Sequence, residues 1–218
     1  EYLTTQFGIN TGTDNLKISQ HADLVVFAVK PQDLVSVMGQ LKGRLDSTQA
    51  ALSIVAGAKM DTLTNGLDHQ SIVRVMPNTP AQVGAGMTLW TCSEGVDSRA
   101  REMTKSVLGT IGQEIYVSDE KYMDMATALS ASGPAYVFLF IEALIDAGVY
   151  VGMPRDMART LVLQTVFGST KLVMDTGMHP AELKDMVVSP GGTTAEALQV
   201  LEGEGVPAAI VSAVDAAY

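Results

Sequence analysis

Short apolar runs separated by helical patterns fill the first half of the chain. The runs are rich in aliphatic and β-branched residues, and they lie at residues 24–29, 52–55, 72–76, 87–91 and 115–117. Between them, residues 33–41 and 96–108 carry apolar side chains at helical spacing. Strands that alternate with helices form a parallel sheet covered by helices. The pattern therefore predicts an α/β domain over residues 1–118.

The pattern changes near Asp119, after which no strand-like run occurs. Apolar residues with helical spacing lie at residues 122–131, 135–151, 155–176, 180–187, 194–202 and 207–217. Glycine and proline residues separate these segments, as is typical of helix ends and turns. We therefore expect a second, all-helical domain over residues 119–218.

Composition narrows the class of protein. With 218 residues, the chain is long enough for two modest domains, each with its own core. The formal net charge of −10 argues against a nucleic-acid partner, because neutralising phosphates requires clustered lysine and arginine.

The remaining composition signals favour a cytoplasmic location. The single cysteine, Cys92, cannot form an intramolecular disulfide, and no Cys/His cluster predicts a metal site. The longest apolar stretch, residues 135–141, is too short to span a bilayer and is followed by Glu142. No secretory signal opens the sequence. We expect a cytoplasmic protein without a metal or a membrane partner.

The run Ser-Pro-Gly-Gly-Thr-Thr at residues 189–194 carries the clearest candidate chemistry. Adjacent glycines leave backbone amides uncovered, and a helix that begins behind them adds unpaired N–H groups. The run is therefore a candidate binding site for a carboxylate or phosphate. Thr193 with Glu196 three residues later predicts a capping box, which leaves the Thr194 hydroxyl at the entrance of this site. The alternative is a glycine-rich turn that only begins a helix.

The longer run LKDMVVSPGGTT at residues 183–194 resembles the signature of pyrroline-5-carboxylate reductases, which form proline in the last step of its biosynthesis. Three further blocks agree in order and spacing: AVKP at 28–31, RVMPNTP at 74–80 and SASGPAY at 130–136. The resemblance covers almost the whole chain. It implies a Rossmann-type domain followed by a helical dimerisation domain, in a homodimer or larger homo-oligomer that reduces a cyclic imine with NAD(P)H.

One part of the expected fold has no counterpart in the sequence. A dinucleotide-binding sheet opens with a strand, a Gly-x-Gly-x-x-Gly turn, a helix and a second strand. The resemblance places Glu1 just after the family's second strand, so the first strands and the pyrophosphate turn are expected to be absent from this chain. Without half of the phosphate cradle, tight dinucleotide binding is not expected.

The remaining cofactor contacts are predicted at strand ends, because ligands of open α/β sheets lie beyond the carboxyl ends of the strands. The resemblance indicates the loops after the strands at 24–29 and 52–55, and geometry adds the loop after 72–76. The predicted cofactor-binding residues are Ala28, Val29, Lys30, Pro31, Ile54, Val55, Ala56 and Asn78. The predicted cofactor is NADPH, with NADH as the alternative.

The substrate site is predicted in the second half of the chain. Amides near Gly192 and Thr193 would bind the substrate carboxylate, and the Thr194 hydroxyl would hold the ring nitrogen as the predicted catalytic group. The resemblance adds Glu120, for which an exposed acid beside Asp119 and Lys121 is an equal alternative. The predicted substrate-binding residues are Glu120, Ser189, Gly191, Gly192, Thr193 and Thr194.

No side chain has the features of a strong general acid. His21, His69 and His179 occupy positions typical of capping or solvent exposure, and Ser132 before Pro134 is typical of a helix N-cap. A cyclic imine reaches the site largely as its iminium, whose carbon is already electrophilic. The protein therefore needs chiefly to align that carbon with the nicotinamide and exclude water.

Two alternatives stay open. A dehydrogenase of the 3-hydroxyacid type would need a lysine acid within a helix of the second domain, for which Lys171 is the candidate. A non-catalytic dinucleotide-binding protein would bind the cofactor without turnover. The run at residues 189–194 disfavours the first alternative.

Overall fold

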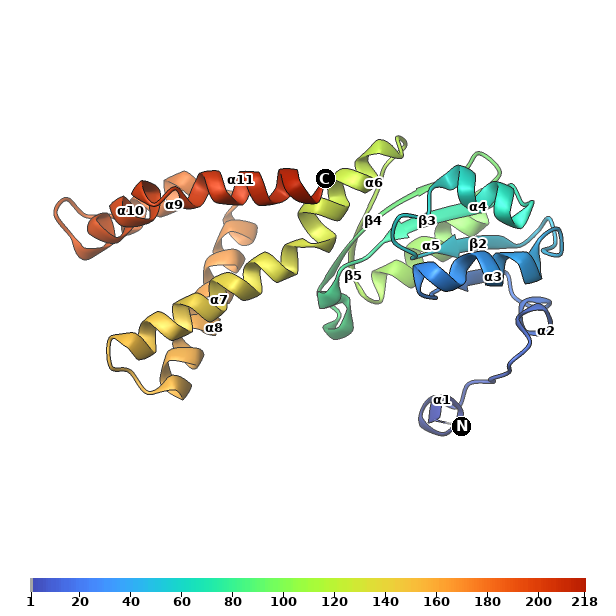
Figure 1. The fold of residues 1–218 in the computed structure, drawn as a ribbon, viewed down its shortest axis with the longest axis horizontal. Coiled ribbons are helices and arrows are strands. Elements are labelled where there is room, and N and C mark those ends of the chain that lie inside the picture. The colour runs from blue at the N-terminus through green and yellow to red at the C-terminus, as the bar shows by residue number, and fades with distance from the viewer. Residues whose placement is uncertain (1) are drawn as a thin grey trace. The chain divides into compact units, whose positions relative to one another are not determined.

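A computed structural model describes residues 2–218 and divides the chain into two compact units. The first unit extends to Ala131, and the second is Ser132–Tyr218 (Figure 1). The α/β class followed by a helical region is as predicted. The predicted boundary after residue 118 differs from this division, because residues 119–131 group with the first unit.

The first unit is built on one five-stranded sheet with strand order β1-β2-β3-β4-β5. Its strands are β1 (Leu24–Phe27), β2 (Ala50–Ser53), β3 (Ile72–Met76), β4 (Gly86–Cys92) and β5 (Gly112–Tyr116). Its helices are α1 (Tyr2–Phe7), α2 (Asn15–Ser19), α3 (Pro31–Leu41), α4 (Met60–Leu67), the 3₁₀ turn η1 (Thr79–Val83), α5 (Ser98–Gly109), α6 (Lys121–Ala126) and the π-helical turn η2 (Thr127–Ala131).

The sheet is parallel except at its centre. β1 pairs parallel with β2 and β2 with β3, whereas β3 and β4 are antiparallel, with Val75 opposite Trp90. β4 and β5 are again parallel. The expectation of a wholly parallel sheet is therefore wrong at one pairing. The physical reason is the connection after β3, which is too short for the crossover that a parallel pair requires.

Side-chain alternation along the strands divides the core between the two faces of the sheet. Ala51 and Ile72 pack with residues of α3 and α4, such as Leu34 and Leu63. The neighbouring strand residues point to the opposite face, where they pack with Trp90 and with residues of α5. The helices α3 and α4 thus cover one face, and α5 covers the other. The carboxyl ends of β1, β2 and β3 are left at one edge.

The second unit contains five helices among the described residues. They are α7 (Gly133–Tyr150), α8 (Arg155–Thr176), α9 (Pro180–Val187), α10 (Thr193–Gly203) and α11 (Val206–Ala217). The predicted bounds of α8 and α9 are confirmed. α7 and α8 pack closely at Gly148, where a β-carbon would lie 2.9 Å from that of Ala158.

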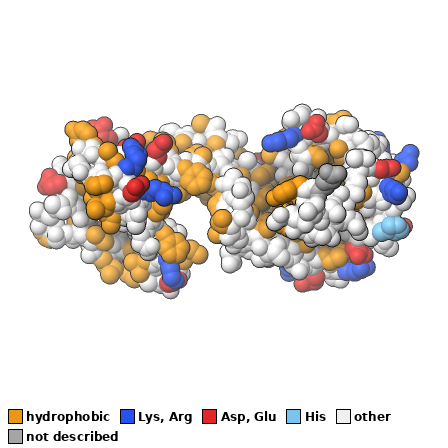
Figure 2. All heavy atoms as spheres, turned by 90° about the horizontal axis from the view of Figure 1, so that it is seen from below, with side chains coloured by type: hydrophobic (Ala, Val, Ile, Leu, Met, Phe, Trp, Pro, Cys, Tyr) orange, Lys and Arg blue, Asp and Glu red, His pale blue; other side chains and the backbone are white. Residues whose placement is uncertain are grey.

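The second unit buries very little apolar surface. Ala158 is the one buried residue of α8, and α7, α9, α10 and α11 have none among the described residues. Large apolar side chains such as Phe138, Leu139 and Phe167 are more than half exposed. Figure 2 shows such side chains at the surface of this unit, on the left of the view.

One helical run has the length and composition of a membrane-crossing segment. An 18-residue window within Lys121–Tyr150 has a mean hydropathy of 1.6, and 6% of that window is buried. The sequence predicts an apolar stretch of residues 135–141 only, which is too short to span a bilayer. The helical run is longer because apolar residues continue beyond Glu142. A bent pair, Thr193–Gly203 with Val206–Ala217, passes the same test jointly. Core helices of soluble proteins can have the same length and composition, although they are mostly buried.

Candidate functional site

The residues before α10 form a tight turn. Gly192 N donates to Ser189 O at 2.9 Å, with Pro190 and Gly191 between them. Gly191 has a φ of +68°, in the left-handed region that glycine adopts without strain. Proline followed by a residue of positive φ gives a type II turn. The sequence Ser-Pro-Gly-Gly therefore dictates the turn that leads into the helix.

At Gly192 the absence of a side chain leaves room for Ser189. A β-carbon there would overlap Ser189 Oγ and lie 3.1 Å from Ser189 O. The two adjacent glycines therefore serve two requirements, backbone conformation at Gly191 and space at Gly192.

The start of α10 presents free backbone donors. The N–H groups of Gly191, Thr193 and Thr194 have no hydrogen-bond partner within residues 2–218. Such groups, together with the helix dipole, favour an anion at this end of the helix. The N–H of Gly192, in contrast, is used within the turn.

The predicted capping box is wrong. Gly192 is the N-cap of α10 and offers no side chain, while Thr193 is already the first helical residue. Ala195 N and Glu196 N donate to Gly192 O at 3.1 and 3.4 Å. Because no side-chain oxygen caps this end, the first amides remain open to a ligand.

The predicted cofactor residues lie along one edge of the sheet. β1, β2 and β3 are parallel neighbours, so the loops that follow them lie side by side. Ala28, Lys30 and Ala56 are exposed there, whereas the side chain of Val55 is buried in the core. Val55 can therefore reach a ligand only through its backbone.

Lys30 and Pro31 begin α3. Lys30 is the N-cap residue with extended backbone, and Pro31 occupies the first turn, where a missing N–H costs nothing. The Lys30 ammonium has no ion-pair partner among the described residues. Its charge is available at the edge where a phosphate or ribose is predicted.

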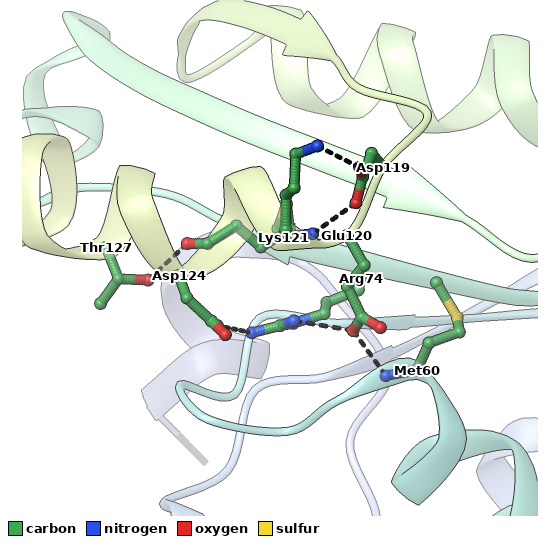
Figure 3. A network of polar contacts seen from close by, with 8 residues as sticks. Met60, Arg74, Asp119, Glu120, Lys121, Asp124 and Thr127 are labelled. Carbon is green, nitrogen blue, oxygen red and sulfur yellow. Dashed lines mark hydrogen bonds and ion pairs between the residues drawn. The ribbon is translucent and has the colours of Figure 1, made fainter. Parts of the chain in front are cut away.

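A charged cluster connects β3, α4 and α6 (Figure 3). Arg74, whose side chain is 2% exposed, donates Nη1 to Glu120 Oε1 at 2.7 Å and Nη2 to Asp124 Oδ1 at 2.9 Å. Glu120 Oε1 also accepts from Met60 N at 2.7 Å. Glu120 is thus not the free exposed acid of the alternative interpretation.

Sequence reasoning missed this cluster. The one available signal was Arg74 within the apolar strand 72–76, because a buried charge requires partners. Nothing in the sequence says which carboxylates supply them. Beside the cluster, the exposed Lys121 ammonium lowers the pKa of the Asp119 carboxyl, with a further contribution from the Lys121 backbone N–H.

The Asn78 side chain connects two segments of the first unit. Its Oδ1 accepts from Met87 N at 2.9 Å, and its Nδ2 lies 3.3 Å from Ser130 O and 3.4 Å from Ser130 Oγ. The side chain therefore fixes the loop after β3. A cofactor contact by Asn78 remains a prediction for its backbone.

The other polar candidates have structural roles. His179 Nδ1 accepts from Ala181 N at the start of α9, as predicted, and His21 is exposed. His69 is buried rather than exposed, and its Nε2 contacts Gln49 O at 2.8 Å. Ser132 precedes α7 as predicted, but its side chain makes no capping hydrogen bond.

Relatives of known function match nearly the whole chain. The Synechocystis pyrroline-5-carboxylate reductase is 41% identical over 218 residues, covering 100% of this chain and 81% of the relative. The Escherichia coli pyrroline-5-carboxylate reductase is 43% identical over 212 residues, covering 97% and 78%. The chain belongs to the pyrroline-5-carboxylate reductase family.

Solved structures agree with this membership. The Plasmodium falciparum pyrroline carboxylate reductase, described with NADP bound, superimposes with a TM-score of 0.90 at 38% identity, covering 97% of this chain and 80% of that one. The Coxiella burnetii pyrroline-5-carboxylate reductase gives 0.91 at 36% identity, covering 99% and 81%.

A family model matches the helical part of the chain. The model is described as "Pyrroline-5-carboxylate reductase dimerisation", and it matches residues 120–218. Residues 120–131 thus belong by sequence to the dimerisation region and by packing to the first unit. Lys171, the candidate acid of the dehydrogenase alternative, pairs with Asp175 on an exposed face of α8.

Proposed function

We propose that the chain reduces the cyclic imine L-1-pyrroline-5-carboxylate to L-proline with NADPH, the last step of proline biosynthesis. The observation that carries this proposal is identity of about 40% with pyrroline-5-carboxylate reductases over nearly the whole chain. The turn at residues 189–192 and the free amides behind it supply the matching chemistry, because the substrate is a carboxylate.

The cofactor is proposed to bind along the edge formed by the ends of β1, β2 and β3. The residues assigned to it are Ala28, Val29, Lys30, Pro31, Ile54, Val55, Ala56 and Asn78. When bound, NAD(P)H supplies the hydride. NADPH is preferred over NADH in this proposal because a structural relative is described with NADP bound.

The substrate carboxylate is proposed to bind the N–H groups of Thr193 and Thr194. The Thr194 hydroxyl then accepts a hydrogen bond from the protonated ring nitrogen, which orients the electrophilic carbon. Gly191, Gly192 and Ser189 shape the turn that exposes these donors.

Glu120 is proposed as the electrostatic partner of the cationic ring. Its Oε1 is engaged by Arg74 and by Met60 N, but its Oε2 has no hydrogen-bond partner among the described residues. The side chain is about one-third exposed (34%), so Oε2 can reach a ligand. Holding Oε1 in place keeps the free oxygen in a fixed direction.

Self-association is proposed to cover the apolar surface of the second unit. The family description names dimerisation, and four of the five helices of this unit bury no residue. A homodimer or larger homo-oligomer would cover these side chains without a membrane. We propose a cytoplasmic location, with neither a nucleic acid nor a membrane as partner.

A spectrophotometric assay tests the proposal. The chain, NADPH and the cyclic imine are mixed, and loss of reduced-nicotinamide absorbance is followed together with formation of proline. Because tight dinucleotide binding is not expected, the assay uses a high NADPH concentration. We expect turnover that needs all three components and that fails with a 3-hydroxyacid and the oxidised cofactor. Turnover of the hydroxyacid would favour the dehydrogenase alternative. Cofactor binding without turnover of either substrate would favour a non-catalytic dinucleotide-binding protein.

A further inference from the structure

The N-terminus of α4 is capped by a side chain from a distant part of the chain. Its own N-cap residue, Lys59, makes no side-chain capping bond. Instead, Met60 N donates to Glu120 Oε1 at 2.7 Å, across 60 positions of sequence. A carboxylate at this end of a helix satisfies a free N–H and lies favourably in the helix dipole.

Arg74 fixes this cap in place. Its buried guanidinium binds the same oxygen, Glu120 Oε1, while its second nitrogen binds Asp124 one turn further along α6 (Figure 3). Glu120 and Asp124 are four residues apart, so they face the same side of the helix. The pair of bonds therefore sets both the position and the rotation of α6 on β3.

The cap ends the loop that carries predicted cofactor contacts. Residues 54–59 connect β2 to α4, and Ile54, Val55 and Ala56 are the residues assigned to the dinucleotide. One end of this loop is held by the sheet and the other by Met60. Gly57, with a φ of +75°, gives the loop a left-handed turn in between.

The same segment, residues 119–131, also holds the next loop. Asn78 Nδ2 contacts Ser130 O. In a helix this carbonyl would accept a hydrogen bond from the N–H four residues later. That residue is Pro134, which has no N–H. One segment thus supports the two adjacent loops after β2 and β3.

We propose that Arg74 and Glu120 are positioning residues for the dinucleotide, acting through Met60 N on the loop at residues 54–59. The inference rests on the proposed function for the location of the cofactor. Asp124 shares the guanidinium but makes no hydrogen bond to residues 54–59 among the described residues, so it serves as the matched control.

The experiment compares Glu120→Ala with Asp124→Ala in NADPH titrations without imine. Glu120→Ala releases one end of the loop, so that cofactor binding has to order it. We expect the NADPH dissociation constant to rise about tenfold, the equivalent of one lost hydrogen bond to a charged group. Asp124→Ala is expected to stay within about twofold of the parent, because the contacts of Glu120 with Arg74 and with Met60 N remain in place. Glu120→Gln, which keeps an acceptor for Met60 N, should restore most of the affinity.

Two further measurements separate positioning from simple destabilisation. Thermal melting of both alanine variants corrects for any loss of folded protein. Amide hydrogen exchange at Met60 should accelerate in Glu120→Ala and in Arg74→Met but remain unchanged in Asp124→Ala. This readout needs neither cofactor nor substrate.

The proposal is overturned if the two alanine variants change NADPH affinity equally, or if Met60 exchange does not respond to Glu120→Ala. A parent chain that binds NADPH but reduces no imine would contradict the proposed function while leaving this inference standing. If the parent chain binds no NADPH while Met60 exchange still responds to Glu120→Ala, Glu120 caps α4 but has no role in cofactor binding, and the proposal is overturned.

Discussion

Ser189 Oγ occupies the position that a β-carbon on Gly192 would need. The hydroxyl of the first turn residue thus lies against the backbone of the fourth, with the turn hydrogen bond from Gly192 N to Ser189 O beside it. Any side chain at residue 192 must displace Ser189 or open the turn.

Replacing Gly192 by valine should therefore weaken substrate binding selectively. We expect the KM for the imine to rise about tenfold or more, because the displaced turn moves the Thr193 and Thr194 amides and costs at least one hydrogen bond to a charged group. The NADPH dissociation constant should change little, since the predicted cofactor residues lie in the other unit. Steady-state kinetics and cofactor titration measure the two effects.

The control for this variant is Gly168→Ala in α8, where a β-carbon meets nothing within 4 Å. It should leave both constants near the parent values. Equal losses of imine and cofactor affinity in Gly192→Val would contradict the separation of the two sites.

Gly191→Ala tests the turn conformation alone. A left-handed backbone costs an L-residue about 1–2 kcal/mol, so we expect a loss of that order in the free energy of unfolding. Gly203→Ala, at the last residue of α10 and without a neighbouring atom within 4 Å, should be neutral or slightly stabilising. Denaturant unfolding of the two variants compares them, and equal stabilities would argue against a strained turn.

Thr194→Val removes one hydroxyl and keeps the branched shape. If the hydroxyl orients the ring nitrogen, the lost bond is expected to cost about 0.5–3 kcal/mol, depending on how much charge it faces. That range corresponds to roughly twofold to a hundredfold in kcat/KM. Thr194→Ser should recover most of the activity. Unchanged kcat/KM in the valine variant, or equal damage by serine, would leave Thr194 as a helix-start residue only.

The Asp119 and Lys121 pair gives a pH prediction. The Lys121 side chain, and then its backbone N–H, hold the pKa of Asp119 below its usual value. A carboxyl with a lowered folded-state pKa stabilises the fold above its unfolded pKa, and this contribution disappears as the pH falls through the folded value. Lys121→Met removes the larger cause, so the Asp119 pKa should rise toward its usual value in an NMR titration. An unchanged pKa would assign the shift to the backbone alone.

Local patterns predicted elements more reliably than they predicted pairings. The bounds of α8 and α9 follow from proline, glycine and apolar spacing, and the structure agrees with them. The antiparallel pairing of β3 and β4 was not predicted, although the short connection between Met76 and Gly86 was a usable signal. The short helix α4 was not predicted, although Met60, Leu63 and Leu67 have helical spacing.

The candidate site was predictable only where its parts are contiguous in sequence. The turn at residues 189–192 is formed by four neighbouring residues, so the proline and the glycines in the sequence predict it. The contact of Arg74 with Glu120 joins residues 46 positions apart, and no local pattern encodes it. The capping box failed because a turn hydrogen bond placed Gly192, rather than Thr193, at the N-cap.

The near absence of buried residues in α7 to α11 bears on how the chain reaches its native state. Helices that bury so little surface gain too little stabilisation within a single chain to offset the conformational entropy that is lost when they become ordered. Folding of this half should therefore be coupled to association, so that its refolding rate depends on protein concentration. Dilution should melt these helices before the sheet, whose two clusters of buried side chains are already closed within one chain.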